Sequence, residues 1–169
     1  MQLPNKQSTT KRIAVCGLLV AVAIVLSYVE FLLPIAPTIP GIKLGLANLV
    51  ILSSLYFIKT REVLLVLTAR ILLSGILFGN LSSVIYSLAG GMLSFLVMLL
   101  VKKINVFSKI GISIAGGVFH NVGQLIVAYI VVKNVSVILY APLLLATGAL
   151  SGCFVGIVST IVMKIFSKY

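Results

Sequence analysis

The chain has 169 residues, 61% of them hydrophobic, and a mean hydropathy of +1.28. A soluble domain of this length needs a polar surface that such a composition does not supply, so a water-soluble globule is excluded and lipid must surround most of the chain. The net charge is +11, from 13 Lys and Arg against two acidic residues, both glutamate. This charge lies between the apolar segments, a pattern that indicates membrane topology and not nucleic-acid binding.

Six apolar segments are candidates to cross about 30 Å of hydrocarbon as helices, which takes about 20 residues each. In chain order they cover residues 13–33, 42–58, 63–78, 81–101, 110–132 and 137–166. The second and third are short, and the sixth is long enough to tilt or to begin as an interfacial stretch. We therefore expect an all-α integral membrane protein, a single six-helix domain over residues 1–169 with a short polar cytoplasmic lead at 1–12 and no cleaved signal peptide.

The basic residues predict the orientation of these helices. If the chain crosses the membrane six times, ten basic residues fall on one side: Lys6, Lys11, Arg12, Lys59, Arg61, Lys102, Lys103, Lys109, Lys164 and Lys168. Only Lys43 and Lys133 fall on the other side. Because cytoplasmic connections are rich in Lys and Arg, both termini are predicted to be cytoplasmic. The first outer connection, "PIAPTIPG" at 34–41, is predicted to be a stiff, extended loop because proline cannot continue either helix.

Arg70 lies near the middle of the third segment, in a stretch that is otherwise aliphatic or small, "LLVLTARILLSG" at 64–75. An arginine at that depth costs a few kcal/mol or more in hydrocarbon. The other polar residues of the apolar segments and their ends fall mainly in the outer half, beneath the proline-rich loop: Glu30, Lys43, Asn48, Asn80, Ser82, Ser83, Tyr86, His120, Asn121 and Gln124. This asymmetry predicts a pocket that opens outward and is closed inward.

Two interpretations of these polar residues are open. Arg70 could pair with Glu30, while the amides and His120 join helices by hydrogen bonds. For His120 alone we favour that interpretation, but for the whole set we favour a binding site, because ionisable groups within a membrane are usually functional. One nearby carboxylate against Lys43 and Arg70 leaves a positive surplus, so we expect a carboxylate, phosphate or diphosphate to bind. Arg70 would clamp this group, and Lys43 at the rim would steer it.

Small residues form a second pattern. Gly148, Gly152 and Gly156 repeat at every fourth position of the sixth segment, and Gly17 and Ala21 have the same spacing in the first. Such faces let helix backbones approach closely. We expect internal packing to explain the glycines of the sixth segment, whereas the Gly17 and Ala21 face could dock a partner.

Three phrases carry a resemblance to a known family: "GIKLGLANLV" (41–50), "LFGNLSSVIYSLAGG" (77–91) and "AGGVFHNVGQLIVA" (115–128). They resemble the Gx transporter family, whose members are often labelled heptaprenyl diphosphate synthase component I. That family is similar to the substrate-binding S components of energy-coupling factor (ECF) importers. The resemblance implies a six-helix bundle with a ligand site near the outer face of a bacterial cytoplasmic membrane. It also implies docking through Gly17 and Ala21, with Gly where Ala is usual, onto a transmembrane coupling subunit driven by two ATPases.

The first functional hypothesis is therefore an S-component-like carrier for a small, anionic and partly apolar solute, such as a quinone or isoprenoid precursor or a vitamin-like molecule. The alternative is a non-catalytic accessory subunit of a polyprenyl diphosphate or menaquinone pathway enzyme, and a third possibility is a carrier that works alone by proton coupling through His120. The chain itself is not expected to be an enzyme, because prenyl synthases hold Mg²⁺-diphosphate with clustered aspartates, which this sequence lacks. No cofactor or metal site is expected, and energy must come from partners because the sequence has no ATP-binding loop.

Overall fold

The computed structural model describes residues 9–33 and 45–166. These ranges form six α-helices and one 3₁₀ helix, with no strand among them. In chain order the elements are α1 (Thr9–Leu32), α2 (Leu46–Phe57), α3 (Thr60–Phe78), α4 (Leu81–Ile104), α5 (Lys109–Val132), the 3₁₀ helix η1 (Val135–Tyr140) and α6 (Ala141–Phe166). The all-α class predicted from the sequence is confirmed.

Four of these helical stretches are long and apolar enough to cross a membrane: α1, α4, α5 and the continuous region Val135–Ile165, which joins η1 to α6. The other two helices are less suited to spanning by themselves. α2 has 12 residues and is therefore only about 18 Å long, and α3 carries Arg61, Glu62 and Arg70 within its 19 residues. The fold is that of a membrane protein, and membrane crossing by α2 and α3 stays a prediction.

Local sequence explains where several helices begin. The side chain of Asn80 accepts a hydrogen bond from the Ser83 backbone N–H at the start of α4, and Ser108 does the same for Gly111 at the start of α5. α2 begins at Leu46, after Gly45 with its φ of 73°, a left-handed conformation that suits glycine. The start predicted at residue 42 falls outside the described residues. The proline-rich loop and Lys43 lie outside the described residues.

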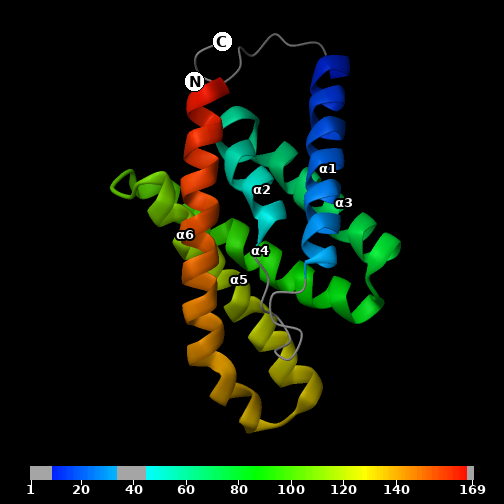
Figure 1. Cartoon of the computed structure of the whole chain (residues 1–169), viewed down its shortest axis with the longest axis vertical. Helices are drawn as coiled ribbons and strands as arrows, with labels where there is room; N and C mark the ends of the chain where they lie inside the picture. Colours follow the sequence, from blue (N-terminus) through cyan, green and yellow to red (C-terminus); the bar gives the residue numbers. More distant parts are fainter. Residues whose placement is uncertain (1–8, 34–44, 167–169) are drawn as a thin grey trace.

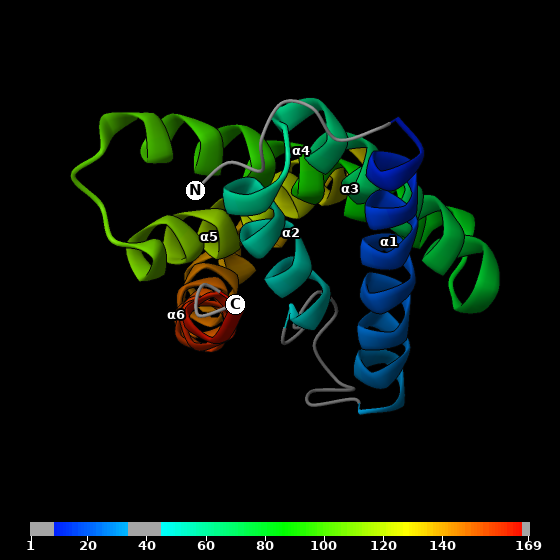
Figure 2. The same ribbon diagram turned by 90° about the horizontal axis from the view of Figure 1, so that it is seen from above.

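The helices α4, α5 and α6 form one packed group, in which α5 lies between the other two (Figure 2). Glycines allow these backbones to approach closely. A Cβ atom added at Gly117 of α5 would lie 2.2 Å from the Gly148 carbonyl oxygen of α6, and one added at Gly123 would lie 2.7 Å from the Ala89 oxygen of α4. The packing role predicted for the glycines of the sixth segment is confirmed.

The helices α1, α2 and α3 form the rest of the molecule, with α1 against both α2 and α3, and α2 also against α6 (Figure 1). α2 and α3 supply most of the hydrophobic core, where Ile51, Leu52, Val66, Leu67 and Ile71 are almost completely buried, and α4, α5 and α6 supply the rest. α1 covers this core from outside, and only Ala23 of its residues is buried. Gly17 and Ala21 lie on the exposed side of α1, and an added Cβ at Gly17 would meet no atom within 4 Å.

An ion pair links the first turns of two helices at one end of the molecule. The guanidinium of Arg12 in α1 binds the carboxylate of Glu62 in α3. α1 begins and α6 ends at this same end, the top of Figure 1. The first helix of the bundle therefore begins, and the last one ends, on the same side.

Candidate functional site

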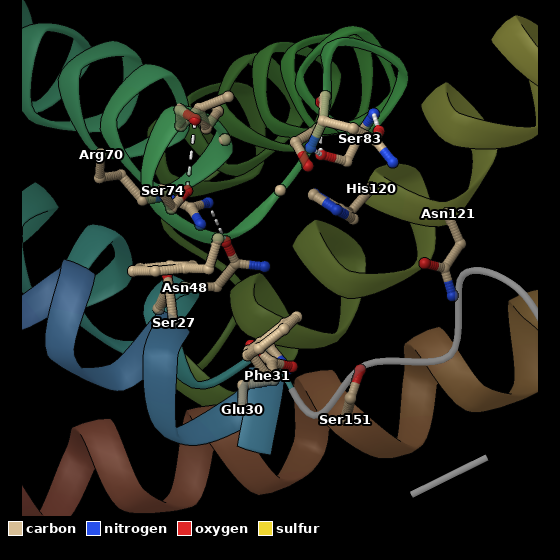
Figure 3. A pocket seen from close by; sticks show the side chains of 18 residues that line it. Ser27, Glu30, Phe31, Asn48, Arg70, Ser74, Ser83, His120, Asn121 and Ser151 are labelled. Atoms are coloured by element: carbon tan, nitrogen blue, oxygen red, sulfur yellow. Dashed lines mark hydrogen bonds between the residues drawn. The ribbon is translucent and has the colours of Figure 1, made fainter. Parts of the chain in front are cut away.

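A cavity of about 320 Å³ lies where residues from all six helices meet (Figure 3). Ligand pockets in proteins typically measure roughly 300–1,000 Å³, so this one suits a small molecule. Of the nine residues that the sequence predicts for a binding site, six line the cavity: Glu30, Asn48, Arg70, Asn80, His120 and Asn121. Side chains that are far apart in the sequence are thus brought to one place.

Arg70 is the most buried charged residue of the cavity, with 8% of its surface exposed. One terminal nitrogen of its guanidinium donates a 2.9 Å hydrogen bond to the Asn48 side-chain oxygen, and its Nε has no hydrogen-bond partner (Figure 3). A guanidinium is a planar fork of N–H donors that matches an oxyanion. Arg70 therefore retains donor capacity that a ligand could use.

Glu30 does not form an ion pair with Arg70, although it lies near enough to act on it electrostatically. The Glu30 carboxylate instead accepts a 2.6 Å hydrogen bond from the backbone N–H of Gly45, at the start of α2. The simple pairing of Arg70 with Glu30, which was the alternative interpretation from the sequence, is not what the described residues form. Glu30 connects α1 to α2 and adds a negative charge to the same cavity.

His120 and Asn121 enter the cavity from α5. Gly90 of α4 makes room for the imidazole, because a Cβ added there would lie 3.1 Å from the His120 Cε1 atom. The side-chain nitrogen of Asn121 donates a 2.5 Å hydrogen bond to the Leu144 carbonyl of α6, so this residue also joins two helices. In Figure 3 His120 lies between Arg70 and Asn121.

Tyr86 and Gln124 do not line the cavity. On α4 the lining side chains are Ser83 and Ser87, and Tyr86 is turned by about 100° from Ser87 around the helix. Gln124 is buried against Gly90, whose added Cβ would lie 3.0 Å from the Gln124 Cγ atom. Tyr86 was predicted from its depth in the membrane, and Gln124 also from its helical spacing to His120 and Asn121, but neither residue contacts the cavity.

Serines and two aromatic rings complete the lining, and apart from Ser83 the sequence did not indicate them. The serines are Ser27, Ser74, Ser83, Ser87 and Ser151. Phe31 and Phe78 form an aromatic wall, with ring centroids 6.1 Å apart. Helical spacing could have indicated some of them, because Ser74 follows Arg70 by four residues and Ser27 precedes Glu30 by three.

The family model for heptaprenyl diphosphate synthase component I matches residues 19–162 of the sequence. The chain belongs to this family. The match includes every described residue that lines the cavity, from Ser27 to Ser151. No curated protein and no solved structure matches the sequence. The family label inferred from the three phrases of the sequence is confirmed, and the family's description implies a partner component in a synthase complex.

The lining of the cavity in this member of the component I family is suited to binding a polar solute. Arg70 offers unused donors, Asn48 and the serines offer hydrogen bonds in either direction, and Phe31 with Phe78 offers an apolar surface. Among the described residues no three His, Cys, Asp or Glu side chains lie close enough together to hold a metal ion. Such a cavity can hold a molecule with an acidic end and a small apolar part.

Proposed function

We propose that the protein binds a small anionic solute within the membrane and delivers it as an S-component-like subunit of an ECF-type importer. One observation carries this proposal: the buried Arg70 guanidinium lines a cavity and keeps an Nε donor without a partner. Burying a cation whose N–H donors are not all paired costs free energy unless an anion binds to those donors. A carboxylate or phosphate of the solute would supply that anion.

The other cavity residues fit the remaining parts of such a solute. Asn48, His120 and the cavity serines would form directional hydrogen bonds, and the wall made by Phe31 and Phe78 would contact an apolar part. The solute would be small and partly apolar, such as a quinone or isoprenoid precursor or a vitamin-like molecule. Since the chain would bind and not transform this molecule, we propose that it is not an enzyme.

The proposed topology is six membrane crossings with both termini in the bacterial cytoplasm. The common end of α1 and α6, together with the basic residues of the α2–α3 and α4–α5 connections, supports it.

A cysteine-labelling experiment tests this topology. Single cysteines introduced by Lys103→Cys and Val135→Cys, in a background with Cys16→Ser and Cys153→Ser, should react differently with a membrane-impermeant maleimide. We expect Val135→Cys to react in intact spheroplasts and Lys103→Cys only after the membrane is opened. Labelling of both positions from the same side would contradict a membrane crossing by α5, which separates them, and with it the six-crossing topology.

Energy for import would come from a transmembrane coupling subunit and two ATPases. The exposed face of α1 around Gly17 and Ala21 supports docking there, because a backbone without large side chains allows a partner helix to approach closely. The family description favours one alternative: a non-catalytic membrane subunit of a polyprenyl diphosphate or menaquinone pathway enzyme.

Affinity purification of the full chain from its native membrane separates the two proposals. An importer subunit should be recovered with a transmembrane coupling subunit and ATPases, and native mass spectrometry should detect a bound anionic molecule that is released on denaturation. Recovery with a prenyl synthase, without ATPases and without a small molecule, would contradict the importer and support the accessory subunit.

A further inference from the structure

A second charged cluster lies at the other end of α2 from the cavity. The side chains of Lys102 and Lys109, which come from the two sides of the α4–α5 turn, both lie over the ring of Tyr56. The Lys102 ammonium is 4.4 Å from the ring centroid, and the Lys109 ammonium is 5.2 Å from it. Lys102 also donates a hydrogen bond to the Leu55 carbonyl of α2. We call these three residues, Tyr56, Lys102 and Lys109, the Tyr56 cluster.

The Tyr56 cluster concentrates positive charge that no acidic side chain of the protein neutralises. The sequence has two acidic residues. Glu30 binds the Gly45 backbone at the cavity, and Glu62 binds Arg12. Two ammonium groups held over one ring repel each other, and the ring offsets this only in part. An anion from outside the protein would relieve the repulsion.

The position of the cluster identifies the kind of anion. Lys102 is in the last turn of α4 and Lys109 is the first residue of α5, and both helices have membrane-spanning length. Where these two helices cross the membrane, the cluster lies at its boundary, among the lipid headgroups. The turn beside it exposes the apolar side chains of Ile104 (57%), Val106 (81%) and Phe107 (52%). Apolar side chains next to lysines are typical of a segment that enters the headgroup and acyl-chain boundary.

We propose that the Tyr56 cluster binds the phosphate of an anionic phospholipid, with Lys102 and Lys109 as its charge partners. The ring of Tyr56 contacts both ammonium groups, and the apolar turn would contact the acyl chains. This site is separate from the cavity and does not depend on the solute or on the partners proposed above. It requires only that α4 and α5 cross the membrane.

The test measures how anionic lipid stabilises the purified protein. Thermal unfolding is followed in neutral detergent with added phosphatidylglycerol or, at equal mole fraction, phosphatidylcholine. The wild-type protein should unfold at a higher temperature with phosphatidylglycerol but not with phosphatidylcholine. In the Lys102→Gln/Lys109→Gln variant, the phosphatidylglycerol needed for half of the effect should rise by about fivefold for each lysine removed.

A matched control removes the same amount of charge elsewhere. Lys103 and Lys133 are exposed, and neither contacts Tyr56, so Lys103→Gln/Lys133→Gln should keep at least half of the wild-type response. Because Lys102 also bonds to α2, the double variant of the cluster could fail to fold. The single variant Lys109→Gln then tests the proposal. It leaves the hydrogen bond between Lys102 and Leu55 in place and should still weaken the response to phosphatidylglycerol.

Three results would overturn the proposal. One is a folded variant of the Tyr56 cluster that phosphatidylglycerol stabilises as much as it stabilises the wild type. Another is a Lys103→Gln/Lys133→Gln control that loses as much of this stabilisation as the cluster variant does. The third is an equal shift with inorganic phosphate, which would assign the site to a free anion and not to a lipid.

Discussion

Replacing Arg70 with alanine will abolish solute binding and leave the helical fold intact. Arg70 has an Nε without a partner and forms a single hydrogen bond, to Asn48. Because this one bond offsets little of the cost of burying the charge, loss of Arg70 should not destabilise the fold. Loss of a buried charge partner should weaken binding of an anion by about 100-fold or more. Glu30 keeps its hydrogen bond from Gly45 in the variant, so no carboxylate is left without a donor.

Binding and folding are measured on the same purified samples. The solute that co-purifies with the wild-type protein is titrated back, and helix content and thermal unfolding are followed by circular dichroism. Arg61→Ala is the matched control, because it removes an exposed arginine from the same helix. Arg70→Met keeps more of the side-chain volume and should also fold and fail to bind. Normal binding by either Arg70 variant, or unfolding of both, would contradict the clamp role.

The Gly117→Ala variant should be strongly destabilised. The added Cβ would lie 2.2 Å from the Gly148 carbonyl oxygen, and a backbone atom cannot move aside as a flexible side chain can. Overpacking of this kind costs about 1–3 kcal/mol, so α5 and α6 must separate or the helices must bend.

The control for this prediction is Gly17→Ala, where the new methyl group meets no atom within 4 Å. Alanine favours a helix over glycine by up to about 1 kcal/mol, so the control should be at least as stable as the wild type. Thermal unfolding by circular dichroism compares the three proteins in one detergent. Equal unfolding temperatures for Gly117→Ala and wild type would mean that α5 and α6 are not in backbone contact.

Helix positions were largely predictable from the sequence because apolar length and terminal residues determine them locally. The fifth segment was predicted at 110–132 and the helix covers Lys109–Val132. The sixth was predicted to start at 137, but a 3₁₀ helix occupies Val135–Tyr140 and α6 begins at Ala141, one residue before Pro142. Proline suits the first turn of an α-helix, where its missing N–H is not needed.

The site was only partly predictable, because depth along a helix can be counted but rotation about its axis depends on packing. Arg70 and Asn48 were predicted at a similar depth; they form a hydrogen bond, and both line the cavity. Tyr86 has a suitable depth but faces elsewhere, and Gln124 packs on Gly90. Apart from Ser83, the cavity serines were not predicted, since a single hydroxyl is common in membrane helices and does not by itself indicate a binding site.

The two glutamate side chains of this protein both connect α1 to a neighbouring helix, one near each end of α1. Glu30 ties its last turns to the start of α2, and Glu62 ties its first turn to α3. Between these attachments α1 packs with partly buried residues, and Ala23 alone is fully enclosed. α1 nevertheless supplies Ser27, Glu30 and Phe31 to the cavity, so two polar contacts and few buried side chains hold one wall of the cavity against the other helices.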